Sequence, residues 1–292
     1  MVSIKTAAIA AILFAEASFM PLQGRVQPLE YAFLHSRNLI SHDEKERIGE
    51  LKERLKEDGF SQSSIDSLFE DKNFKLERDI AGKFKVNPES QFASGKIPYS
   101  KYRKILDLDG IITKAPAFFE KYKNDFEEAE KRYGVGKRYI AGILGVESRF
   151  KERKQIGGYK AFNALVSQYI LTDRKKFAYR EIKELIAFSE TTGIPVFSFN
   201  SSYAGAIGHA QFIPSSLNMA FVGKRGKAGK PNPMDVVDCI YSIANYLSTA
   251  GWDRKQNKSE IKPNSRNWKA IRAYNKSDAY IMAVIEISNS LK

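Results

Sequence analysis

One carboxylate in an otherwise apolar helical pattern is the first candidate for chemistry in this sequence. The run 136–150 reads as a helix, and Ile140, Leu144 and Glu147 follow the 0, 4, 7 spacing that lines one helical face. An ionised carboxylate in apolar surroundings is costly unless it is paired or takes up a proton. A carboxyl group that keeps its proton near neutral pH can act as a general acid. The alternative is a Glu147 side chain that lies at the helix end and reaches water or Arg149.

An irregular segment downstream is the second notable feature. Residues 201–216 read Ser-Ser-Tyr-Ala-Gly-Ala-Ile-Gly-His-Ala-Gln-Phe-Ile-Pro-Ser-Ser, and Gly205, Gly208 and Pro214 interrupt any long element there. Irregular segments that a rigid scaffold holds in place are common sites of binding and catalysis. This segment is therefore predicted to take part in the chemistry of the protein.

The rest of the chain follows helical patterns. Ser41 and Glu44 form a capping-box pattern at the start of a helix that Gly59 ends. Pro116 is predicted to open a helix that ends just before the Glu147 helix, so that the two pack as an antiparallel pair. Another helix is expected from Pro233 to about residue 250, and an amphipathic helix over 278–291. The predicted fold class is mainly α.

Cys239 is the only cysteine, which excludes an intramolecular disulfide. It falls within the apolar spacing of the helix that follows Pro233, as a small core residue would. A catalytic thiol would need a basic partner, and no histidine lies near it in the sequence.

Residues 1–17 resemble a secretory signal peptide. Lys5 supplies the positive charge, residues 7–14 an apolar core, and Ala15-Glu16-Ala17 a cleavage site. The apolar run is too short to span a bilayer, and a buried first helix of the mature fold is the alternative. We expect a periplasmic or secreted protein, cleaved near Ala17, with no stable membrane anchor.

The net charge of +13 favours a polyanionic partner. The densest basic cluster is Lys224, Arg225, Lys227 and Lys230, and it lacks the interleaved aromatic residues that stack on nucleic-acid bases. Because export makes nucleic acid a poor candidate, an acidic cell-wall polymer is the better match. We expect a monomer.

Four ordered motifs resemble one known family. Residues 145–150 (Gly-Val-Glu-Ser-Arg-Phe) and 201–216 closely resemble the membrane-bound lytic transglycosylase B family of murein-cleaving enzymes. Asn245-Tyr246-Leu247 with Gly251-Trp252 matches a third family motif, and residues 273–280 match a fourth. Tyr102-Arg103 is a fainter match, and residues 18–95 match only weakly.

The resemblance implies a lysozyme-like helical catalytic domain over residues 96–292, with an additional helical N-terminal region over 18–95. It implies that Glu147 is the sole catalytic acid/base, and that Ser202 and Gln211 form hydrogen bonds near it. The residues it implies for substrate binding are Tyr102, Ser202, Tyr203, Gln211, Tyr274, Asn275 and Tyr280.

The implied substrate is a peptidoglycan glycan strand, cut between N-acetylmuramic acid and N-acetylglucosamine. Most glycosidases need two carboxylates, and the two central motifs, 145–150 and 201–216, hold only Glu147. One suffices if the muramoyl acetamido group assists and the sugar's own C6 hydroxyl closes a 1,6-anhydro ring. Glu147 would then act first as acid and then as base, with no metal or organic cofactor.

Two departures from the family pattern stand out. Family members often carry an acidic calcium-binding loop where this chain has Lys224 to Lys230, so no metal site is expected. His209 adds a titratable ring beside Gln211; we expect it at the surface, and contact with the substrate is the alternative. Two alternatives stay open: a muramidase that lets water finish the reaction, and a non-catalytic wall-binding protein.

Overall fold

The structure is a computed structural model that describes residues 40–85, 98–151 and 157–291. The predicted signal segment 1–17 and the boundary predicted between residues 95 and 96 lie outside these ranges. The α-helices are α3 (His42–Glu57), α4 (Gln62–Phe69), α5 (Asp79–Lys85), α7 (Tyr99–Leu106), α8 (Leu108–Lys121), α9 (Lys123–Tyr133), α10 (Lys137–Ser148), α11 (Ala161–Leu171), α12 (Lys175–Thr192), α13 (Pro214–Ala220), α14 (Val236–Thr249), α15 (Arg266–Tyr274) and α16 (Asp278–Ser290). The mainly α prediction is confirmed.

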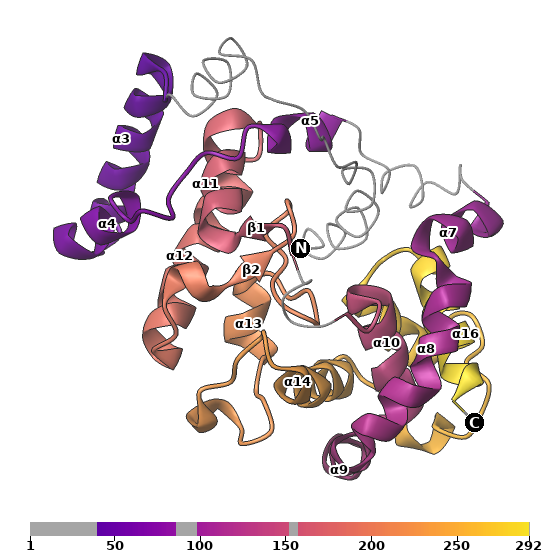
Figure 1. The fold of residues 1–292 in the computed structure, drawn as a ribbon. Coiled ribbons are helices and arrows are strands. Elements are labelled where there is room, and N and C mark those ends of the chain that lie inside the picture. The colour runs from indigo at the N-terminus through magenta and orange to yellow at the C-terminus, as the bar shows by residue number, and fades with distance from the viewer. Residues whose placement is uncertain (1–39, 86–97, 152–156, 292) are drawn as a thin grey trace, which may run out of the picture.

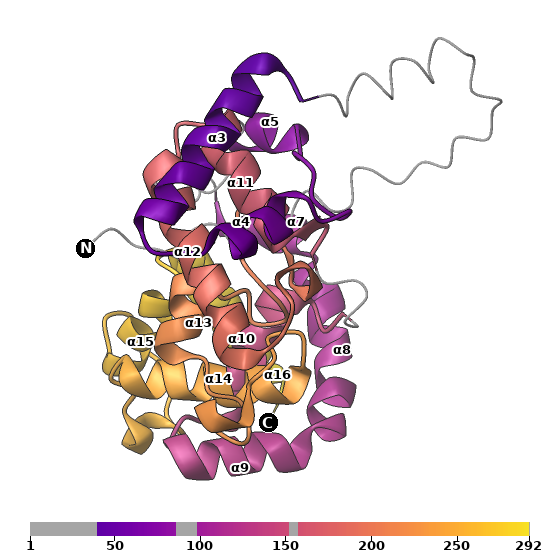
Figure 2. The same ribbon diagram turned by 90° about the vertical axis from the view of Figure 1, so that its left-hand side faces the viewer.

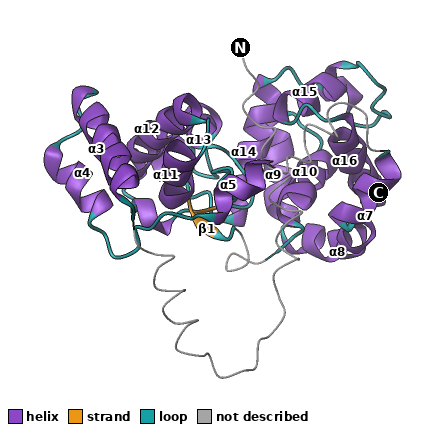
Figure 3. Ribbon diagram, turned by 90° about the horizontal axis from the view of Figure 1, so that it is seen from above, coloured by secondary structure: helices purple, strands orange, loops and turns teal. Residues whose placement is uncertain are grey.

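The helices form two groups around one continuous core. In one group α3, α5, α12 and α13 pack on or beside α11, and in the other α8, α9, α14 and α16 surround α10 (Figures 1 and 3). A single hydrophobic cluster runs from Leu51 of α3 to Ile287 of α16. Strands β1 (Tyr159–Lys160) and β2 (Asn200–Ser201) pair antiparallel, and β2 leads into the irregular segment.

The predicted capping box at the start of α3 is confirmed. The Ser41 side chain accepts a hydrogen bond from the backbone N–H of Glu44, and the Glu44 side chain accepts one from the backbone N–H of Ser41. Arg78 binds both carboxylate oxygens of Glu44. Leu51 and Leu55 are fully buried. Arg54 of the same helix donates a hydrogen bond to the Tyr169 hydroxyl of α11, and its carbonyl oxygen accepts one from the Tyr179 hydroxyl of α12. These two contacts hold α3 against α11 and α12 (Figure 2).

The Glu44–Arg78 pair predicts a loss of stability in acid. Hydrogen bonds from Arg78 hold the pKa of Glu44 at about 2, below its ordinary value of 4.5. A carboxyl group whose pKa is lowered by folding stabilises the fold above its unfolded-state pKa, and this contribution is lost as the pH falls through the folded-state pKa. We expect Glu44→Gln to lower the free energy of unfolding by about 1–3 kcal/mol at neutral pH, and by much less near pH 2. Urea unfolding across this range measures the difference, and Glu50→Gln on the exposed side of α3 is the control.

The predicted helix start at Pro116 is wrong. Pro116 lies inside α8, and the chain breaks instead at Tyr122, before α9. Leu108, Ile111 and Ala115 are buried on one face of α8, upstream of the proline. Burying that face outweighs the one backbone hydrogen bond that proline cannot donate.

The helix after Pro233 starts three residues later than predicted. The α14 helix begins at Val236, because the Asp235 side chain accepts a hydrogen bond from the backbone N–H of Asp238 and caps the helix. Its end near Gly251 and the final helix α16 are as predicted. Among the described residues, no helix combines the length and apolar character needed to cross a membrane.

Candidate active site

Glu147 lies in the last turn of a helix that is buried on all sides. Every residue of α10 from Tyr139 to Ser148 is buried, and the Glu147 residue is only 3% exposed. Gly142 lets α16 approach closely, since a Cβ there would lie 2.5 Å from Ser288 Oγ and 2.6 Å from the carbonyl oxygen of Val284. The two helices therefore pack directly against each other.

This close packing brings a tyrosine of α16 to the carboxylate. The Tyr280 hydroxyl donates a hydrogen bond to Glu147 Oε1 at 2.7 Å, and Tyr280 is fully buried. Burial and the nearby Glu147 charge raise the pKa of Tyr280 well above its ordinary value. The phenol therefore keeps its proton and acts as a donor to the carboxylate.

Two further predicted tyrosines lie close to this pair. The Tyr274 ring stacks parallel to that of Tyr280, with 6.4 Å between centroids. Burial, and then the Glu147 charge, raise the pKa of Tyr274 well above its ordinary value. Tyr102 is fully buried and near enough to Tyr280 to contribute to its raised pKa. The structure thus brings Tyr274 and Tyr280 together beside Glu147, and buries Tyr102 near Tyr280.

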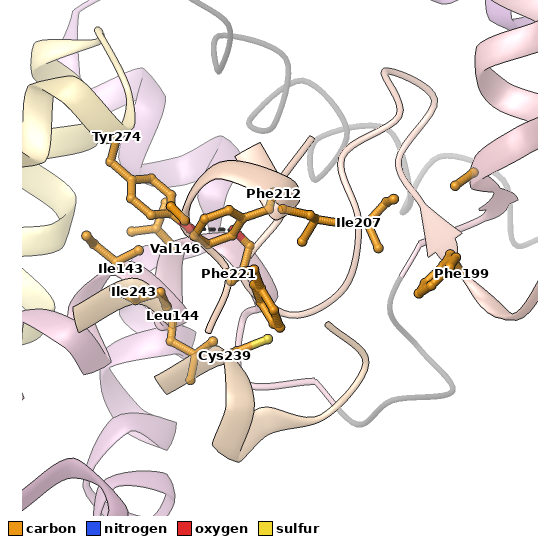
Figure 4. Close-up of a cluster of buried hydrophobic side chains, with 14 of the residues drawn as sticks. Ile143, Leu144, Val146, Phe199, Ile207, Phe212, Phe221, Cys239, Ile243 and Tyr274 are labelled. Carbon is orange, nitrogen blue, oxygen red and sulfur yellow. Dashed lines mark hydrogen bonds between the residues drawn. The ribbon is translucent and has the colours of Figure 1, made fainter. Parts of the chain in front are cut away.

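The irregular segment is anchored to this cluster by Phe212. Its ring makes edge-on contacts with Tyr274 and Phe221, at 5.7 and 5.5 Å between centroids (Figure 4). It makes a third edge-on contact with Tyr246, at 5.9 Å. The Tyr274 hydroxyl also donates to the carbonyl oxygen of Ala210. Three of the sequence motifs therefore meet at one aromatic contact.

The side chains of Ser202 and Gln211 form hydrogen bonds within the irregular segment itself. Ser202 Oγ accepts from the backbone N–H of Ala206 at 3.1 Å, and Gln211 Nε2 donates to the carbonyl oxygen of Gly208 at 2.7 Å. Gln211 has a φ of 47°, which is uncommon for a residue with a side chain. A role for these side chains in contacting Glu147 or a substrate stays a prediction.

Gly208 fixes the path of this segment. Its φ is +69°, and a Cβ there would lie 1.9 Å from the carbonyl oxygen of Pro233. The backbone N–H of His209 donates to the same carbonyl. His209 is consequently 2% exposed, and the expectation that it lies at the surface is wrong.

Asn275 and Tyr203 lie in different surroundings. Asn275 Oδ1 accepts from the backbone N–H of Ser277, and its buried Nδ2 has no hydrogen-bond acceptor among the described residues. A buried donor without a partner costs about 1–3 kcal/mol, which a bound water or ligand would relieve. The Tyr203 ring packs instead in a small separate cluster, edge-on to Phe84 of α5.

Glu181 holds the end of the irregular segment, and the sequence analysis missed it. This carboxylate of α12 is fully buried; it accepts hydrogen bonds from the backbone N–H and the hydroxyl of Ser215, at 2.8 and 3.0 Å. Arg180 also binds it, and burial raises its pKa. The position of Glu181 in an amphipathic helix did not indicate a buried acid, because Ser215, which binds it, lies 34 residues away in the sequence.

Removing the Glu181 carboxylate should loosen the end of the irregular segment at Ser215. We expect Glu181→Ala to lower the free energy of unfolding by about 1–3 kcal/mol, since the Ser215 N–H loses its acceptor. Glu181→Gln keeps one acceptor oxygen and should recover part of the loss. Melting temperatures of both variants measure this, and equal stability of Glu181→Ala and the unchanged protein would contradict the anchoring role.

Cys239 lies beneath the same segment as a core residue, as predicted. It is fully buried, its thiol donates to the carbonyl oxygen of Pro233, and burial raises its pKa (Figure 4). A thiol in this state is a poor nucleophile.

The lysine-rich loop after α13 is closed by carboxylates. Lys224 Nζ lies 2.8 Å from Asp125 of α9, and Asp238 accepts from the backbone N–H groups of Lys224 and Asn232. Within the described ranges, no group of three acidic, cysteine or histidine side chains could hold a metal ion.

Comparison with known proteins places these motifs in a family. The model of the transglycosylase SLT domain matches residues 43–265. Membrane-bound lytic murein transglycosylase B of Escherichia coli (strain K12) is 29% identical over 153 residues, which are 52% of this chain and 42% of that protein. This chain thus aligns with less than half of the relative's length.

Solved structures share the fold. The soluble lytic transglycosylase SltB1 from Pseudomonas aeruginosa matches with a TM-score of 0.70 and 24% identity, over 84% of this chain and 97% of that chain. SltB3 from the same organism, solved with NAG-anhNAM-pentapeptide, matches with a TM-score of 0.70 and 18% identity, over 86% of this chain and 80% of that chain. The Escherichia coli lytic transglycosylase Slt35, solved with bulgecin A, matches with a TM-score of 0.65 and 19% identity, over 91% of this chain and 98% of that chain. These matches confirm the lysozyme-like helical fold, and because the family model spans most of the sequence, the chain belongs to the transglycosylase SLT domain family.

Proposed function

We propose that this protein is a lytic transglycosylase that cleaves peptidoglycan between N-acetylmuramic acid and N-acetylglucosamine, with Glu147 as its acid/base. The observation that carries the proposal is the buried Glu147 carboxylate with the Tyr280 hydroxyl bound to Oε1. Membership of the transglycosylase SLT domain family supports it, as does the likeness to a murein transglycosylase.

The contacts of Glu147 suit proton transfer in both directions. Burial disfavours the charged carboxylate, which helps the side chain to keep a proton until a substrate arrives. Because Oε1 accepts the Tyr280 hydroxyl, the transferable proton belongs on Oε2. Once that proton has moved to the leaving oxygen, the Tyr280 hydrogen bond stabilises the resulting carboxylate, which then acts as a base.

The buried carboxylates of the described residues favour a mechanism with one acid. Apart from Glu147 they are Glu44, which Arg78 binds, and Glu181, which Ser215 binds. Neither is available as a second catalytic group. We therefore propose that the muramoyl acetamido group assists departure and that the C6 hydroxyl of the same sugar closes the anhydro ring, without a metal or organic cofactor.

The substrate-binding residues follow from the same arrangement. We propose that Tyr102, Tyr274 and Tyr280 line the sugar site beside Glu147, and that Asn275 Nδ2 donates to the substrate. Ser202, Tyr203 and Gln211 would contact it from the irregular segment. SltB3, solved with NAG-anhNAM-pentapeptide and with NAG-NAM-pentapeptide, supports peptidoglycan fragments as ligands.

We also propose an exported monomer in which residues 1–17 are a signal peptide. Residues 18–95 would form an N-terminal region that braces a catalytic domain over 96–292. The packing of α3 and α5 on α11 supports this bracing role.

Mass spectrometry of soluble products from purified peptidoglycan tests the proposal. Products with anhydro ends, each lighter by one water than a reducing end, are the expected result. Products with reducing ends would point to a muramidase, the reaction named beside transglycosylase for a 36 kDa protein of the same fold. An absence of products would point to a non-catalytic wall-binding protein.

A further inference from the structure

A strongly basic pocket lies at the opposite end of α10 from Glu147. It has a volume of about 630 Å³ and is lined by Lys137, Arg138, Arg254, Lys255 and Lys258, with Glu130 as the one carboxylate among its lining residues. Lys137 begins α10, ten residues before Glu147. At 1.5 Å per residue, that places this end of the helix roughly 15 Å from the proposed catalytic site.

The cations of this pocket are only partly neutralised. Lys137 pairs with Glu127 at 2.8 Å, and Glu130 Oε1 already accepts from the Asn257 side chain. Arg254, Lys255 and Lys258 are exposed and form no ion pair within the part of the chain that the structure describes. Like charges held around one pocket repel each other, and a multivalent anion would relieve that repulsion.

Asn257 holds the basic segment rigidly in place. Its Oδ1 accepts from Trp252 Nε1 at 2.7 Å and from the backbone N–H of Gly136 at 3.1 Å. Its Nδ2 donates to the carbonyl oxygen of Gly134 and to Glu130. Residues 254–258 are thereby fastened to the turn between α9 and α10, so a ligand would not have to order them.

The start of α10 breaks a common preference of helices. Lys137 and Arg138 occupy its first turn, where the helix dipole favours acidic residues instead. Residues that are locally unfavourable in this way occur at functional sites, where another interaction offsets their cost in stability. An anion in the pocket would supply that gain.

We propose that this pocket binds the phosphate group of an anionic ligand, at a site separate from Glu147. A phosphate group carries at least one negative charge at neutral pH, and the fork of an arginine matches its oxygens in a bidentate contact. The ammonium groups of Lys255 and Lys258, beside the Arg254 guanidinium, supply the further positive charge that such a ligand needs. The site does not depend on the proposed cleavage reaction.

A calorimetric titration of the full-length protein with inorganic pyrophosphate tests the site. We expect saturable binding that weakens as salt is added, because exposed charges are screened. Arg254→Glu/Lys255→Glu/Lys258→Glu should lower the affinity by at least about tenfold, since three charge-assisted contacts are lost. The control Lys45→Glu/Lys72→Glu/Lys114→Glu makes the same change of net charge at exposed lysines elsewhere, and should bind pyrophosphate almost as well as the unchanged protein.

Vesicles with and without phosphatidylglycerol distinguish the source of the phosphate. Binding to the anionic vesicles that the pocket variant loses would assign a lipid headgroup, and pyrophosphate binding alone would assign a soluble ligand. Lys255→Glu alone serves if the triple variant does not fold. No pyrophosphate binding, or equal binding by the pocket and control variants, would overturn the proposal.

Discussion

Glu147→Gln is expected to yield a folded protein that has lost nearly all cleavage of peptidoglycan. The amide keeps the shape of the side chain and can still accept the Tyr280 hydroxyl, but it has no proton to transfer. General acid–base catalysis contributes about 10²- to 10⁴-fold, so the release of soluble fragments should fall by that factor.

Stability and binding separate this effect from damage to the fold. The melting temperature and the binding of insoluble peptidoglycan should stay close to those of the unchanged protein. Glu53→Gln, at an exposed position of α3, is the matched control and should cleave normally. Turnover of Glu147→Gln at the unchanged rate would show that the acid lies elsewhere.

Tyr280→Phe is expected to slow cleavage by about one to two decades. It removes the hydrogen bond to Glu147 Oε1, and a hydrogen bond to a charged group is worth about 1.5–3 kcal/mol. The hydroxyl stabilises the charged form of Glu147, so removing it should raise the pKa of that acid. The limb of the rate profile on which the acid loses its proton should therefore move to higher pH.

A buried tyrosine elsewhere provides the control. Tyr169 accepts a hydrogen bond from Arg54, so Tyr169→Phe also loses a contact to a charged group. It should change stability without moving the pH profile of cleavage. If Tyr280→Phe changes only the melting temperature and leaves the profile in place, Tyr280 has a structural role alone.

Features set by neighbours in sequence were predictable. The capping box of Ser41 and Glu44 depends on two residues three positions apart, and its geometry is confirmed. The apolar spacing around Cys239 and along α16 likewise gave the buried faces of those helices. The resemblance of the motifs led to the family and the fold that the comparisons show.

Features set by distant contacts were not predictable. The hydrogen bond from Tyr280 joins residues 133 positions apart and depends on how closely Gly142 lets α16 approach. Glu181 reads as a solvated helical residue until Ser215 is seen beside it. His209 is buried because Gly208 folds the backbone onto Pro233. In each case a contact between residues distant in the sequence, which the local pattern does not reveal, sets the environment of the side chain.

Digestion of purified peptidoglycan in heavy-oxygen water tests most directly whether Glu147 drives cleavage with ring closure by the sugar's own hydroxyl. Mass spectrometry should find anhydro products without the heavy isotope from the unchanged protein, and almost no products from Glu147→Gln. Products that each carry one heavy oxygen, or equal product release by Glu147→Gln, would contradict the proposed mechanism.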